Sequence, residues 1–106
     1  MNKKNIILLI TALSINFIFA QTAVYSFGEL DEDNGTLGII LSNSQDAYGF
    51  QLNISGVTLT DVYGGSAEEN GIFISYSGST GNILGLSFSG ATIPAGSSVL
   101  FNISFS

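Results

Sequence analysis

Apolar and polar residues alternate with a period of two along most of this chain, and that alternation restricts it to β-structure. The clearest run is Tyr48–Ser55, and residues 37–41, 84–88 and 99–105 repeat the pattern. Because successive side chains of a strand point to opposite faces, each run predicts a strand with one face in a core and one toward solvent. The positions predicted to face the core are Leu37, Ile39, Leu41, Tyr48, Phe50, Leu52, Ile54, Leu84, Leu86, Phe88, Val99, Phe101, Ile103 and Phe105.

Glycine and small polar residues separate these runs at the spacing of turns. Asn34-Gly35 and Asn70-Gly71 suit turn positions with a positive φ, and Pro94 precedes the last run, where it removes no central hydrogen bond. Shorter strands are expected at 23–27, 57–60 and 72–76, with one helical turn around 66–70. About seven short strands at this spacing predict an all-β sandwich.

The first twenty residues have the layout of a secretory signal peptide. Lys3 and Lys4 precede an apolar run at 6–19, and Ala20 is a small residue suited to cleavage. The run has about 14 residues, whereas a helix that spans the bilayer needs roughly 20. We therefore expect a signal peptide at 1–20 and a secreted, extracellular or cell-surface domain at 21–106. An uncleaved membrane anchor is the alternative; after cleavage no membrane span is expected.

The predicted mature chain has eight acidic side chains, a formal charge of −8, and no Lys, Arg, His or Cys. Such a chain repels nucleic-acid phosphates, so nucleic-acid binding is excluded. Its serines and threonines have no activating base nearby, and no basic or aromatic residue flanks its carboxylates to tune their pKa. We therefore expect no enzyme, no catalytic residue and no disulfide.

The densest acidic cluster is the turn that contains Asp31, Asp33 and Asn34. Calcium prefers carboxylate and carbonyl oxygens, and turn carboxylates two residues apart can converge on one ion. These three residues are therefore candidate calcium ligands, and calcium is the one cofactor considered. The alternative is a solvated turn that keeps strand edges soluble. Asp61, Glu68 and Glu69 form a second, weaker candidate cluster.

Four residues are candidates for ligand binding. Tyr63 and Tyr76 have flat apolar rings with a polar edge, which suits stacking on sugars. Gln51 and Asn53 lie on the expected outward stripe of the run 48–55, where amides can bond sugar hydroxyls or a partner strand. The alternatives are tyrosines of the core or of turns, and an ordinary solvent-facing stripe.

Three segments follow one another along the chain: 37–54 (LGIILSNSQDAYGFQLNI), 57–67 (VTLTDVYGGSA) and 83–105 (ILGLSFSGATIPAGSSVLFNISF). Together they resemble the cohesin family and its relatives among the carbohydrate-binding β-sandwiches. The resemblance implies a jelly-roll or immunoglobulin-like sandwich of seven to nine strands. Cohesins bind calcium-loaded dockerin modules, and relatives bind polysaccharides or serve in adhesion. By analogy, the binding face includes 48–55 and neighbouring strands. This chain is shorter than a typical cohesin.

We therefore expect a secreted, non-catalytic, cohesin-like module for protein–protein interaction or scaffolding, whose partner is a dockerin-like module. One alternative is a carbohydrate-binding module on extracellular polysaccharide. The other is a structural surface or adhesion element, or a fragment of a larger extracellular protein truncated at the C-terminus. A protein interface predicts an exposed apolar patch. A fragment predicts an open sheet edge beside 99–105.

Overall fold

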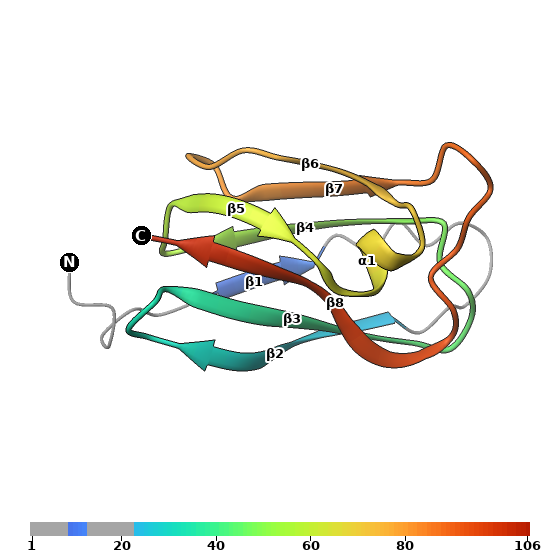
Figure 1. Cartoon of the computed structure of the whole chain (residues 1–106), viewed down its shortest axis with the longest axis horizontal. Helices are drawn as coiled ribbons and strands as arrows, with labels where there is room; N and C mark the ends of the chain where they lie inside the picture. Colours follow the sequence, from blue (N-terminus) through green and yellow to red (C-terminus); the bar gives the residue numbers. More distant parts are fainter. Residues whose placement is uncertain (1–8, 13–22) are drawn as a thin grey trace.

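Two four-stranded antiparallel sheets face each other, which confirms the all-β prediction (Figure 1). The computed structural model describes residues 9–12 and 23–106. Sheet A contains, in spatial order, β1 (Leu9–Ala12), β4 (Gly49–Ser55), β7 (Asn82–Leu86) and β6 (Phe73–Tyr76). Sheet B contains, in spatial order, β2 (Ala23–Asp31), β3 (Thr36–Asn43), β8 (Gly96–Phe105) and β5 (Leu59–Tyr63). A short helix, α1 (Gly65–Glu69), lies against β8 where a helical turn was expected.

The inward faces of the two sheets form one apolar core. Most positions predicted for it are buried, including the sets at 37–41, 50–54 and 101–105. Phe50 of sheet A and Phe101 of sheet B stack with ring centroids 5.7 Å apart, and so join the two layers. Gly85 pairs with Phe50 across β4 and β7, and a Cβ at Gly85 would overlap the Phe50 ring. A glycine is therefore required under that ring.

The predicted alternation fails in the first half of β8. Phe101 pairs with Ile39, but Ile40 pairs with Val99 and not with Leu100, so the register between β3 and β8 shifts by one residue. A β-bulge of this kind reverses the faces on one side of it. Leu100 is consequently fully buried, whereas Val99, which was predicted to face the core, is 40% exposed.

The prediction that Leu84, Leu86 and Phe88 face the core is wrong. Ile83 and Gly85 point into the core, whereas Leu86 and Phe88 are exposed and Leu84 is half-buried. Both faces of this strand carry apolar residues, so alternation alone leaves its orientation undetermined. The Phe50 ring fills the space above Gly85, so the core needs no larger side chain there. Tyr48, also predicted as core, is exposed because it precedes the start of β4.

The open edge beside 99–105 that the fragment alternative predicts is not present in the described residues, because β8 lies between β3 and β5 and pairs with both. The strand β1 falls inside the predicted signal peptide and pairs with β4. The rest of that segment lies outside the described residues, so the signal peptide stays a prediction. Within residues 9–12 and 23–106, no helix has the length and apolarity needed to cross a membrane.

Candidate functional site

The outward face of sheet A changes from apolar at one end to polar at the other. Register places its outward residues in rows that cross β4, β7 and β6. The first row is Gly49, Leu86 and Phe73, the second is Gln51, Leu84 and Ser75, and the third begins with Asn53 and Asn82. This face contains β4, the strand that the family resemblance assigns to binding.

Three exposed side chains form an apolar patch at the first end of this face. Phe73 is 55% exposed, Phe88 is 77% exposed, and their ring centroids lie 5.6 Å apart at a tilt of 57°. Leu86 is the direct partner of Phe73 across β6 and β7, so it lies on the same face. Phe73, Leu86 and Phe88 are together called the apolar patch below. Contiguous exposed apolar residues of this kind mark interaction sites more often than single exposed ones do.

The polar end of the face is held by its own hydrogen bonds. The Asn53 side-chain amide donates to the Thr80 carbonyl oxygen at 2.8 Å and to Asn82 Oδ1 at 2.7 Å. These bonds fasten β4 to the turn between β6 and β7. Asn53 was predicted to contact a ligand, but its amide donor is engaged within the protein.

Gln51 lines an open hollow of about 200 Å³ on the same face, together with Ser75, Tyr76 and Asn82. The Tyr76 hydroxyl donates to the Thr60 carbonyl oxygen at 3.2 Å and thereby bridges the edges of the two sheets. Tyr63 lies on β5 opposite Asn102, so it belongs to sheet B. Gln51 and Asn53 therefore share the outward face of β4, whereas Tyr76 is in register with the buried Ile83 and reaches toward sheet B. Tyr63 lies apart from them on sheet B.

The candidate calcium turn is closed by Asp31 itself. Asp31 Oδ1 accepts hydrogen bonds from the backbone N–H groups of Asp33 and Asn34, each at 3.1 Å. Asp31 Oδ2 accepts from the Asn34 side-chain amide at 2.7 Å. In the described part of the chain, no three His, Cys, Asp or Glu residues are grouped as metal ligands. The calcium site stays a prediction, and the hydrogen bonds give Asp31 a structural role in the turn.

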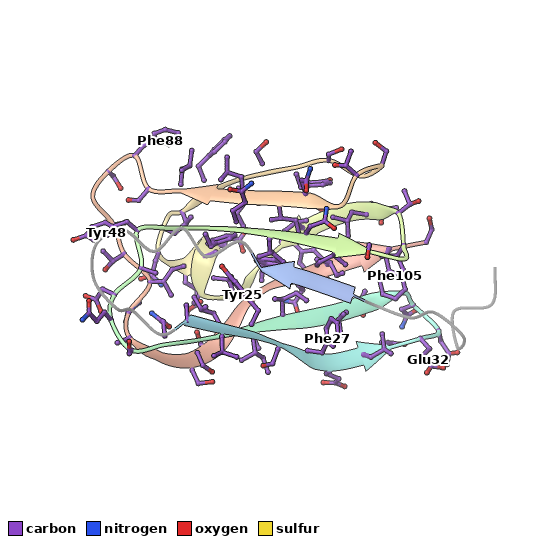
Figure 2. All side chains as sticks on the ribbon, turned by 180° about the vertical axis from the view of Figure 1, so that it is seen from behind. Tyr25, Phe27, Glu32, Tyr48, Phe88 and Phe105 are labelled. Carbon is purple, nitrogen blue, oxygen red and sulfur yellow. The ribbon has the colours of Figure 1, made fainter. Side chains whose placement is uncertain are left out.

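None of the acidic side chains belongs to a strand of sheet A. They are in β2, β5, α1 and the turns after β2 and β3, and no acidic or basic residue occurs from Asn70 to Ser106. Figure 2 shows Glu32 at one end of the sandwich and Phe88 and Tyr48 at the other. The strands β4, β6 and β7 that form this face consequently contain no charged residue in an otherwise acidic protein.

Tyr25 links the two sheets on the side of β1 and β2, opposite the side where Tyr76 bridges β6 and β5. Tyr25 is on β2 of sheet B, and its phenol is hydrogen-bonded to the backbone of Gln51 on β4. Burial raises the pKa of Tyr25 from 10.0 to about 12, and this hydrogen bond lowers it in part. Only a donor to the phenol oxygen favours the phenolate, so the Gln51 N–H is the donating group.

Comparison with family models, with curated proteins and with solved structures gives no significant match to this chain. The site is therefore defined by its own geometry. Sequence reasoning missed Phe73 as a surface residue and assigned Leu86 and Phe88 to the core. The available signal was the segment 83–88, in which both alternating sets contain apolar residues although a strand needs only one to fill a core.

Proposed function

We propose that this protein is a secreted, non-catalytic binding module that recognises a protein partner through the outer face of sheet A. The observation that carries this proposal is the apolar patch. Two exposed phenylalanines in contact cost solubility and contribute nothing to the core, so their burial by a partner is the simplest use for them. Aromatic side chains clustered at the centre of an interface dominate binding energies in protein complexes.

The surroundings of the patch favour a protein over a polysaccharide. The two rings are tilted by 57°, so they form no flat platform for consecutive sugar rings. The Asn53 side-chain amide donates its hydrogen bonds within the protein, which leaves it less suited to sugar hydroxyls. An uncharged apolar centre with a polar rim is the usual composition of a protein interface.

The family resemblance supplies the partner class. Cohesins bind dockerin modules, and in this chain the segment that resembles the cohesin binding strand, 48–55, contributes β4 to the same face. The crossing of consecutive strands from β3 to β6 between the two sheets is compatible with a jelly-roll. We therefore name a calcium-loaded dockerin-like module as the partner to test first.

The test compares three variants of the full chain on immobilised, calcium-loaded dockerin modules. Phe73→Ser and Phe88→Ser remove the patch, and Val24→Ser removes a similarly exposed apolar residue from sheet B. Each patch variant should weaken binding by about tenfold or more, whereas Val24→Ser should leave it unchanged. Equal weakening by all three variants would contradict the assignment of the face.

A parallel experiment applies the full chain to insoluble polysaccharides, with calcium and with a chelator. The protein-binding proposal expects no retention. Retention that is lost on substitution of Gln51 or Tyr76 would instead assign the hollow of sheet A to carbohydrate binding.

A further inference from the structure

The edge of β4 carries an inference that rests on the secretion in the proposed function but not on binding at the face of sheet A. The N–H of Ile54 donates to the Gly81 carbonyl oxygen, toward β7. Since backbone groups alternate in direction along a strand, those of Asn53 and Ser55 point the opposite way, toward β1. The strand β1 covers this stretch in antiparallel register, from Leu52 opposite Ala12 to Ser55 opposite Leu9.

The chain that covers this edge lies inside the predicted signal peptide. Cleavage after Ala20 would remove β1 and leave the backbone of β4 uncovered from Leu52 to Ser55. The strand β4 contains no charge and no proline, and its pairing with β7 has no bulge. Charges, prolines and bulges are the features with which natural proteins usually protect a strand edge. Because β4 lacks them, an uncovered β4 is a template for another strand.

The side of the sandwich next to β1 is also apolar. Phe27 and Leu30 on β2 pair with the buried residues Ile39 and Leu37, so they point inward, yet each is 43% exposed. The strands β2 and β4 run in the same direction (Figure 1), and Tyr25 contacts Gln51. Phe27 and Leu30 therefore lie further along, beside the part of β4 that β1 covers, and Figure 2 shows Phe27 on that side.

Tyr25 sets one limit of this site. Its phenol oxygen accepts a hydrogen bond from the N–H of Gln51. Toward the start of β4, this N–H is the next one after that of Asn53 to point to the edge of the sheet where β1 lies. A strand that adds to the edge therefore pairs from Leu52 onward, as β1 does. An added strand has two positions opposite the inward-facing Leu52 and Ile54, and apolar residues at these positions would extend the core toward Phe27.

We propose that the edge of β4 from Leu52 to Ser55 is a strand-acceptor site for an extended, uncharged segment of a different protein. The incoming segment pairs antiparallel to β4 in place of β1, with apolar residues opposite Leu52 and Ile54. Main-chain hydrogen bonds supply affinity in this mode of recognition, and the alternate side chains supply specificity.

The test uses the full chain with Thr11→Pro, which disrupts β1 at the position paired with Asn53. The probe is a fluorescent peptide with the sequence of residues 6–13 and a soluble lysine tail. Its matched control is the same peptide with proline in place of the threonine. Binding is followed by fluorescence anisotropy, and amide hydrogen exchange locates the protected residues. Circular dichroism checks that the variant remains folded.

The variant should bind the probe about tenfold more tightly than it binds the proline peptide, and about tenfold more tightly than the wild-type chain does. The amides of Asn53 and Ser55 should become protected. Equal binding of the two peptides would overturn the proposal, because it would show apolar adhesion without strand pairing. Protection of the same amides by self-association, without peptide, would overturn it by making a second copy the occupant.

Discussion

The two sheets of this sandwich bury similar inward faces but differ in what they expose. Sheet B exposes isolated apolar residues, such as Val24 and Val99, and a polar pair in which Ser42 donates to Ser97 at 2.9 Å. Sheet A exposes the contiguous apolar patch. Two of its strands, β6 and β7, belong to the part of the chain after Glu69, which contains no charged residue. A core uses only one of the two sets of alternating residues in a strand. The second apolar set on β7 is therefore not explained by folding, and the proposed binding function gives it a role.

The sharpest test of this comparison applies one chemical change to both sides of the sandwich. Phe101→Ala removes a fully buried ring and should lower the free energy of unfolding by about 3–5 kcal/mol. Phe88→Ala removes a ring that is 77% exposed and should change it by less than about 0.5 kcal/mol. Urea denaturation measures both. A large loss for Phe88→Ala would make the patch part of the core.

Two glycines give the next largest contrast. Gly85→Ala places a methyl group into the Phe50 ring and should destabilise the domain by about 1–3 kcal/mol. Gly38→Ala, on β3, places a methyl group 3.5 Å from Asn102 Oδ1, an ordinary contact, and should be neutral or slightly stabilising. Thermal unfolding compares the pair. Equal effects would mean that Phe50 moves aside at little cost.

The Tyr25 link between the sheets predicts a loss of stability at high pH. The pKa of Tyr25 is about 12 in the folded protein and 10.0 without burial, so the folded state holds the proton more tightly. The contribution of protonated Tyr25 to the free energy of unfolding is complete below pH 10 and is lost as the pH rises toward 12. The loss should be roughly 1–2 kcal/mol, since solvent at this partly buried group weakens the effect. Urea denaturation from pH 9 to 12 measures it, and Tyr25→Phe should flatten the profile.

The smallest expected effect lies in the acidic turn of sheet B. Asp31→Ala removes the acceptor of two backbone N–H groups and one amide, and should cost about 1 kcal/mol in the presence of a chelator. Differential scanning fluorimetry measures the change. Repeating the scan with calcium tests the candidate metal site, because stabilisation of the wild type alone would assign the ion to this turn.

The strands were predictable wherever only one alternating set is apolar. Residues 50–54 and 101–105 meet that condition, and both were assigned to the correct face. The segment 83–88 does not, and its orientation depends on the Phe50 ring above Gly85, which is a contact between strands distant in sequence. The bulge that exposes Val99 likewise arises from pairing with Ile39 and Ile40. Local periodicity contains no information about either contact.

The candidate site was predicted in part for the same reason. The strand 48–55 was correctly assigned an outward stripe with Gln51 and Asn53. Tyr63 was grouped with them because each residue was judged by its own chemistry, whereas sheet membership depends on the crossing of the chain between layers. The apolar patch combines residues of β6, β7 and the following loop, and only their pairing brings them together.

The absence of acidic and basic side chains from Asn70 to Ser106 has a consequence for how the proposed partner would reach the face of sheet A. Charged interfaces accelerate encounter by long-range attraction, and their association rates fall steeply as salt is added. For the proposed partner, attraction from charges on this face is absent, and only the field of the eight acidic residues elsewhere on the protein acts at long range. That field is screened within a Debye length, so the association rate of a neutral partner should change little as salt is added.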